Sequence, residues 1–125
     1  MSRDLPGGVA SIRRARDDAR AFLVRVRPEL AEKTVEDVLL AVSELVTNAV
    51  RHAPGRCTVR LAVDEQRVSV AVSDGSSSDP TIRPPRADGR GGYGLHLLRA
   101  LAGDFEVRPD AGGKTVSVSL RRSTD

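Results

Sequence analysis

Two runs of alternating apolar residues constrain the fold of this chain more than any other feature. The apolar residues are Cys57, Val59, Leu61 and Val63 in the first run and Val68, Val70 and Val72 in the second. Thr58 and Arg60 point the other way, and the polar segment 64–66 separates the runs. Two such runs joined by a short polar turn predict an antiparallel hairpin that is covered on one face only.

Helical spacing precedes these runs. Apolar residues three and four apart predict a helix over Val9–Val26, which Pro28 closes. Thr34 is the expected N-cap of a second helix that runs to about His52. A short third helix is expected over Tyr93–Ala102.

A second hairpin closes the chain. It is expected to run from Phe105 and Val107, through the turn 110–113, into a strand whose apolar face holds Val116, Val118 and Leu120. Strands with one apolar face need helices on that face. The predicted fold class is therefore α/β (α+β): a two-layer sandwich with a mixed, mostly antiparallel sheet and helices on one face.

The length and charge of the chain limit the number of domains and the kinds of partner that it can have. A chain of 125 residues has room for one compact domain, 1–125. Its net charge of +3 comes from basic residues spread among acids, and two Phe and one Tyr give almost no stacking surface. Direct nucleic-acid binding is therefore not predicted.

The lone Cys57 allows no internal disulfide, and the longest apolar run, Val38–Val42, is too short for a membrane span. These features predict a cytoplasmic protein without a membrane partner.

Two segments contain candidate functional residues. Glu44 and Asn48 are four residues apart, so they stack on one polar face of the second helix. A long loop rich in Ser, Pro and Gly begins at Asp74 and ends in the glycines of 91–94, where a helix is expected to start. Glycines at a helix start let backbone N–H groups approach an anion. A loop of this length, about 75–91, is typical of a lid.

Together these motifs resemble a known family. ELVTNAVRHA (44–53), VSDGSSSDP (72–80), GGYGLHLL (91–98) and GGKTV (112–116) occur in the order found in the GHKL, or histidine-kinase-like, ATPases. Within that superfamily the chain is most similar to the anti-sigma-factor serine/threonine protein kinases. The resemblance covers nearly the whole chain, and it implies the GHKL ATPase fold with ATP and Mg²⁺ as cofactors.

The resemblance also implies roles for single residues. Asn48 matches the asparagine that holds the Mg²⁺ bridging the ATP phosphates, and Glu44 matches the general base. Asp74 matches the aspartate that accepts a hydrogen bond from the adenine amino group. Gly92 and Gly94 match glycines that present amides to the phosphates.

Two further motif positions complete the expected site. Thr115 resembles the threonine that supports the aspartate beside adenine. His52 matches a residue common in the first motif, and its role is left open, with a simply structural one as the alternative. These assignments follow from the resemblance alone.

The implied function is an ATP-binding anti-sigma factor and serine/threonine protein kinase. It would phosphorylate an anti-anti-sigma partner and sequester a sigma factor. The first strand of fuller family members is reduced here to Arg3–Pro6, an edge that often contributes to dimers, so a homodimer is one expected assembly.

One departure from the family pattern keeps an alternative open. Ser76 and Ser78 occupy positions that are glycines in the family's aspartate loop. If a glycine is needed there for close approach of the nucleotide, ATP affinity falls. The alternative hypothesis is a catalytically degenerate GHKL-fold regulatory module that acts by protein contacts alone.

Overall fold

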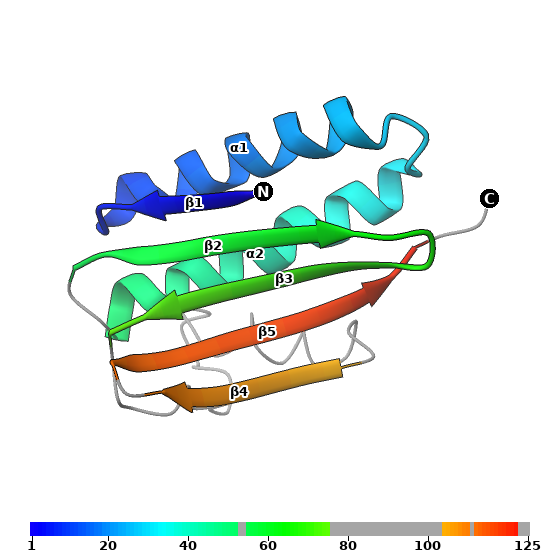
Figure 1. Cartoon of the computed structure of the whole chain (residues 1–125). Coiled ribbons are helices and arrows are strands. Elements are labelled where there is room, and N and C mark those ends of the chain that lie inside the picture. Colours follow the sequence, from blue (N-terminus) through cyan, green and yellow to red (C-terminus); the bar gives the residue numbers. More distant parts are fainter. Residues whose placement is uncertain (53–54, 76–103, 111, 123–125) are drawn as a thin grey trace, which may run out of the picture.

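A computed structural model describes residues 1–52, 55–75, 104–110 and 112–122. These residues form two layers, with two helices packed on one face of a sheet (Figure 1). The strands lie in the order β1-β2-β3-β5-β4. The helices are α1 (Val9–Val26) and α2 (Glu32–His52); the strands are β1 (Ser2–Leu5), β2 (Cys57–Val63), β3 (Arg67–Asp74), β4 (Asp104–Asp110) and β5 (Gly113–Arg121).

The predicted two-layer α+β fold is confirmed. Both predicted hairpins form, β2 with β3 and β4 with β5. The sheet was expected to be mixed and mostly antiparallel, and each of the pairings among the described strands is antiparallel. Short hairpin connections account for two of these pairings, β2 with β3 and β4 with β5.

The chain's first residues form a true strand. β1 pairs with β2 in antiparallel register, with Leu5 opposite Cys57, and the Leu5 side chain is almost fully buried. The reduced segment predicted at Arg3–Pro6 therefore still extends the sheet by one edge strand.

The first helix has the predicted bounds, but the predicted start of the second is wrong. α2 begins at Glu32, and Thr34 is a buried residue inside its first turn rather than the N-cap. The Val35 N–H donates to the Ala31 carbonyl at 3.1 Å, so the helical hydrogen-bond ladder is already established before Thr34. A threonine before acidic residues is a common cap signal, and here burial of the side chain outweighs it.

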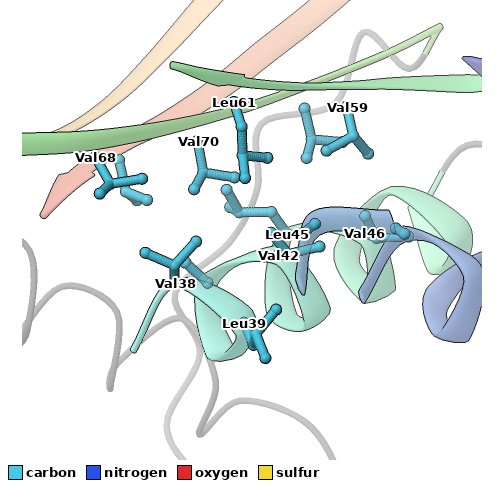
Figure 2. Packing of buried hydrophobic residues seen from close by; sticks show 14 of the residues in the cluster. Val38, Leu39, Val42, Leu45, Val46, Val59, Leu61, Val68 and Val70 are labelled. Carbon is cyan, nitrogen blue, oxygen red and sulfur yellow. The ribbon is translucent and has the colours of Figure 1, made fainter. Parts of the chain in front are cut away.

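The core lies between α2 and the sheet. In Figure 2, Val38, Val42 and Leu45 of α2 point toward the sheet, where β2 and β3 present their apolar faces. The buried residues labelled there are Val38, Leu39, Val42, Leu45, Val46, Val59, Leu61, Val68 and Val70. The core is aliphatic, as three aromatic residues in the chain require. In the part of the chain that the structure describes, neither helix combines the length and apolar character needed to cross a bilayer.

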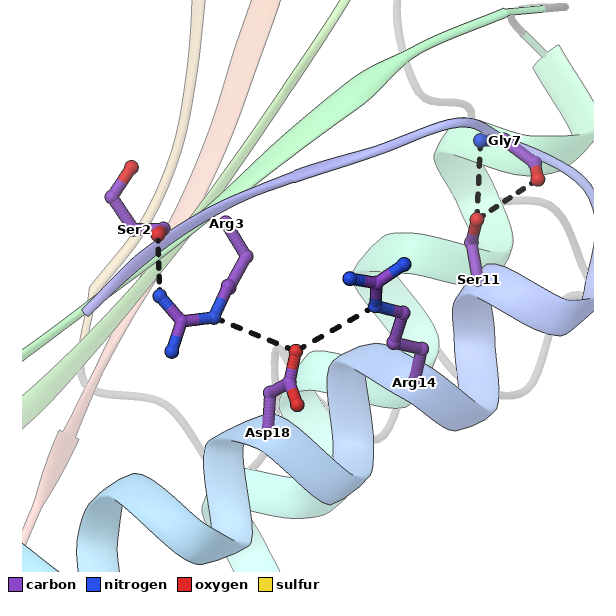
Figure 3. Close-up of polar contacts among 6 residues, drawn as sticks. All are labelled: Ser2, Arg3, Gly7, Ser11, Arg14 and Asp18. Carbon is purple, nitrogen blue, oxygen red and sulfur yellow. Dashed lines mark hydrogen bonds and ion pairs between the residues drawn. The ribbon is translucent and has the colours of Figure 1, made fainter.

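Polar contacts fix the connection from β1 to α1 (Figure 3). The Ser11 hydroxyl accepts a hydrogen bond from the Gly7 N–H at 3.1 Å and donates one to the Gly7 carbonyl at 2.9 Å. Asp18 on α1 lies 3.6 Å from the Arg3 guanidinium of β1 and 4.0 Å from that of Arg14. These ion pairs are partly exposed, so they orient the edge strand more than they stabilise it.

We expect Gly7→Ala to destabilise the protein more than Gly8→Ala. Both glycines have positive φ, 97° and 82°, where a side chain costs about 1–3 kcal/mol. A Cβ on Gly7 would also collide with the Gly55 carbonyl, whereas a Cβ on Gly8 meets nothing within 4 Å. Urea unfolding of the two variants separates backbone strain from this collision. Equal losses would show that the turn can move away from Gly55.

Candidate functional site

A row of three buried side chains crosses the sheet at one end. Asp74, the last residue of β3, lies opposite Cys57 of β2 and opposite Lys114 of β5. Because paired residues share a face of the sheet, all three point to the face that the helices cover. Their exposed fractions are 3% for Cys57, 9% for Asp74 and 2% for Lys114. The row is therefore a polar end to an otherwise apolar layer.

The end of α2 lies at this same end of the molecule. Only residues 53–56 connect α2 to β2, and Figure 1 shows the end of α2 beside the end of β3 and the beginnings of β2 and β5. The second half of α2 carries Glu44 and Asn48. The fold thus brings the helix motif and the Asp74 motif, which are far apart in sequence, to one end of the two-layer structure.

Lys114 and Asp74 form a buried ion pair. The Lys114 Nζ lies 3.4 Å from Oδ2 of Asp74 and 3.5 Å from Oδ1. The two side chains are only 3% and 2% exposed. A buried charge is costly unless it is paired, so this contact explains how both groups are accommodated in the core.

Lys114 was not among the residues predicted for the site, although the sequence carries a signal for it. Lys114 precedes Val116 and Val118 at intervals of two residues, and both valines were assigned to the inner face of their strand. Period two therefore places Lys114 on that face as well. A lysine that continues an apolar face needs a buried partner, and Asp74 is such a partner.

Thr115 lies on the other face of the sheet. It is in register with Ser73, and its Oγ1 lies 2.7 Å from the Ser73 Oγ. Successive side chains of a strand point to opposite faces, so the Thr115 hydroxyl is directed away from the Asp74 carboxylate. The expectation that Thr115 supports Asp74 beside adenine stays a prediction, and the residue of β5 in register with Asp74 is Lys114.

Glycine is required where β5 passes the end of β3. A Cβ on Gly113 would collide with the Asp74 carbonyl and would lie 2.8 Å from the Gly75 Cα. The glycines of 112–113 were interpreted as a hairpin turn. The structure adds that Gly113 lets β5 approach β3 at Asp74, which brings Lys114 within reach of the carboxylate.

Asn48 and Glu44 have different environments. Asn48 is 8% exposed, and Glu44 is half-buried. Burial raises the pKa of the Glu44 carboxyl above its ordinary value, and the positive charge of Arg51 opposes part of that rise. A carboxylate with a raised pKa accepts a proton more readily, which suits a general base.

Cys57 is a neutral member of the row. Burial raises the pKa of its thiol, and the negative charge of Asp74 raises it further. Cys57 is a free cysteine in the structure. A buried thiol of this kind behaves as a small apolar group with a weak donor.

Several predicted features lie outside the described residues. They are Ser76 and Ser78, the expected lid after Gly75, the glycines Gly92 and Gly94, and the helix expected over 93–102. His52 is the last residue of α2. Among the residues that the structure does describe, no group of three or more His, Cys, Asp or Glu side chains is placed to hold a metal ion.

Comparison with known proteins gives a consistent result. The family model described as "Histidine kinase-like ATPase domain" matches residues 5–120. The serine-protein kinase RsbW of Bacillus licheniformis is 35% identical over 105 residues, which cover 70% of this chain and 64% of that protein. RsbW of Listeria monocytogenes serotype 4a (strain HCC23) is 34% identical over 107 residues, covering 72% and 68%.

A solved structure shares the fold. The crystal structure of the RsbU and RsbW domains of Rv1364c from Mycobacterium tuberculosis matches with a TM-score of 0.69 and 22% sequence identity. The match covers 100% of this chain and 33% of that one. The chain spans 64% of the length of the Bacillus licheniformis relative, so part of that protein has no counterpart in the match.

Proposed function

This chain belongs to the histidine kinase-like ATPase family, and from that premise we propose that it is an ATP- and Mg²⁺-dependent serine/threonine protein kinase and anti-sigma factor. One observation carries the proposal. The buried Asp74 ends β3 at the end of the molecule where α2 terminates, and the second half of α2 holds Glu44 and Asn48. In the proposed site the Asp74 carboxylate would bind the adenine ring, the Asn48 amide would hold the metal ion, and the Glu44 carboxylate would accept the proton.

The residues fit the nucleotide chemically. Asp74 would accept a hydrogen bond from the adenine amino group, and burial protects that contact from water. The Asn48 amide oxygen is a hard ligand that suits Mg²⁺. Gly92 and Gly94 would present backbone amides to the phosphates. Gly113 lets the backbone of β5 pass close to the Asp74 carbonyl, where a Cβ would collide.

Glu44 would act on the acceptor hydroxyl. Its carboxylate would take the proton from a serine or threonine of the protein substrate as that oxygen attacks. The raised pKa of Glu44 favours this proton transfer. Bound ATP supplies the γ-phosphoryl group, and Mg²⁺ offsets its charge.

The proposed partners follow from the resemblance to the anti-sigma-factor kinases. RsbW proteins are named serine-protein kinases. We infer an anti-anti-sigma protein as the phosphorylated partner and a sigma factor as the sequestered one, so that the chain regulates transcription in the cytoplasm without contacting nucleic acid or membrane. A homodimer through the β1 edge is part of the same proposal.

Calorimetry with ATP, with and without Mg²⁺, tests the nucleotide site. Incubation with γ-labelled ATP and a cognate anti-anti-sigma protein then tests the kinase. We expect Mg²⁺-dependent binding and label on the partner. No heat of binding at millimolar ATP would contradict the proposal. Binding of the partner without label would favour the regulatory module suggested by Ser76 and Ser78.

A further inference from the structure

Lys114 contacts both oxygens of the Asp74 carboxylate. Its Nζ lies 3.4 Å from Oδ2 and 3.5 Å from Oδ1, so the ammonium straddles the carboxyl group rather than approaching one oxygen. Both side chains are almost fully buried. A buried cation at nearly equal distances from the two oxygens fixes the orientation of a carboxylate, because rotation would carry an oxygen away from the charge.

The strands hold Lys114 in this place. The register between β3 and β5 sets Lys114 opposite Asp74. Gly113 lets β5 pass close to the Asp74 carbonyl, where a Cβ would collide. Val116, the next residue on the same face of β5, is buried in the core, so the aliphatic stem of Lys114 continues a packed apolar layer. The position of the ammonium is therefore set by the sheet itself.

We propose that Lys114 is a positioning residue of the nucleotide site, which holds Asp74 in the orientation and charge state that the base of ATP requires. The inference rests on the proposed ATP-binding function, in which Asp74 accepts a hydrogen bond from the adenine amino group. Lys114 acts through Asp74 and needs no contact with the nucleotide. No motif of the sequence analysis gives Lys114 a role.

The charge of Lys114 matters because Asp74 is buried. Burial without a cation favours the neutral form of a carboxyl group. Hydrogen bonds to an ionised group are about twice as strong as those between neutral groups, so a neutral carboxyl would bind the amino group more weakly. Cys57, which lies opposite Asp74 on β2, cannot replace the cation, since a thiol carries no positive charge.

A mutant cycle on ATP affinity tests the inference. Calorimetry with ATP and Mg²⁺ measures the dissociation constant for the intact protein, Lys114→Met, Asp74→Asn and the double variant. We expect Lys114→Met to weaken ATP binding by about tenfold, because the remaining carboxyl is neutral or turned away from the base. In the Asp74→Asn background the same substitution should change the affinity by less than about twofold, since Lys114 acts through Asp74. The cycle isolates this part of the effect, whatever other contacts the carboxylate makes.

The cycle also separates positioning from a merely structural role. A lysine that only supports packing would weaken ATP binding to the same extent in both backgrounds, and that result overturns the inference. An unchanged ATP affinity in folded Lys114→Met overturns it as well. Lys33→Met, at an exposed position of α2, is the matched control and should bind ATP like the intact protein.

The two lysines of the chain allow a second test that needs no substitution. Isotopic labelling of the lysine ε carbon gives one NMR signal from Lys114 and one from Lys33. ATP with Mg²⁺ should shift the Lys114 signal, because Lys114 contacts the carboxylate that binds the base. The Lys33 signal should stay in place. Tripolyphosphate with Mg²⁺, which has the phosphates without the base, should move neither signal.

The NMR result decides if a variant does not fold. ATP binding by calorimetry with an unmoved Lys114 signal overturns the inference. A shift of the same size with tripolyphosphate also overturns it, since that result would place Lys114 beside the phosphates rather than behind Asp74. No binding of ATP to the intact protein contradicts the proposed function itself.

Discussion

Glu44→Gln is expected to reduce phosphoryl transfer to the partner protein by about 10²–10⁴-fold while ATP binding changes little. The amide keeps the size of the carboxyl group but cannot take a proton. Label transfer from γ-labelled ATP measures the rate, and calorimetry measures binding. Glu36→Gln, at an exposed position nearer the start of the same helix, is the matched control and should transfer at the normal rate.

The pH dependence of transfer provides a second signature of Glu44. Because burial raises the pKa of Glu44, the carboxylate is lost as the pH falls through that raised value, and the rate should fall with it. Arg51 lowers the pKa of Glu44, so Arg51→Gln should move this decline to higher pH. If the transfer rate declined at the same pH in the unsubstituted protein and in Arg51→Gln, a group other than Glu44 would control the pH dependence.

Glu44→Gln should also increase the stability of the folded protein. A carboxyl whose folded pKa is raised contributes stability below its unfolded pKa and loses it as pH rises through the folded value. At neutral pH the ionised Glu44 is therefore unfavourable in the folded state, and Glu44→Gln should melt at a higher temperature. The gain should shrink as the pH falls from the raised folded pKa towards the ordinary pKa of glutamate, and it should vanish below that ordinary value. A residue that lowers stability while serving catalysis is typical of active sites.

Lys114→Met is expected to destabilise the protein by about 3–5 kcal/mol, since it leaves the Asp74 carboxylate charged and buried. The single variant Asp74→Asn should cost a similar amount because it leaves the ammonium alone. The double variant Asp74→Asn/Lys114→Met contains no buried charge at the row and should recover much of the loss. Urea unfolding of the four proteins gives the coupling between the two side chains.

An ion pair at the surface serves as the control for the buried Lys114–Asp74 pair. Lys33 and Asp37 lie 3.0 Å apart on α2, a shorter distance than in the buried pair, but the Lys33 side chain is 70% exposed. Lys33→Met should change stability by less than about 1 kcal/mol. If Lys114→Met costs no more than Lys33→Met, the buried pair makes no special contribution. A large single loss without recovery in the double variant would indicate that Lys114 matters for packing rather than charge.

Much of the fold could be predicted because its signals are local. The bounds of α1 and β2 follow from helical and strand periodicity, and both hairpins follow from short polar turns between apolar runs. The start of α2 could not be fixed in this way. Thr34 has the chemistry of a cap, but its burial in the first turn depends on contacts that the local sequence does not specify.

The candidate site was predictable in part. Glu44, Asn48 and Asp74 were found from motif resemblance, and the structure places their elements at one end of the sheet. Their functional roles stay proposals. Alternation along β5 does place Lys114 with the core valines, but a resemblance drew attention to Thr115 instead.

The sequence by itself determined the elements, the apolar face of each strand and the family of the chain, because these depend on periodicity and motif spacing along one segment. Only the tertiary structure decided which residue of β5 meets Asp74. That choice depends on the register between β3 and β5, which is set by strand pairing and by the close approach at Gly113. A shift of one residue in that register would exchange Lys114 for Thr115 and move every side chain of the strand to the other face. The charge beside the carboxylate is therefore a property of the fold rather than of the motif.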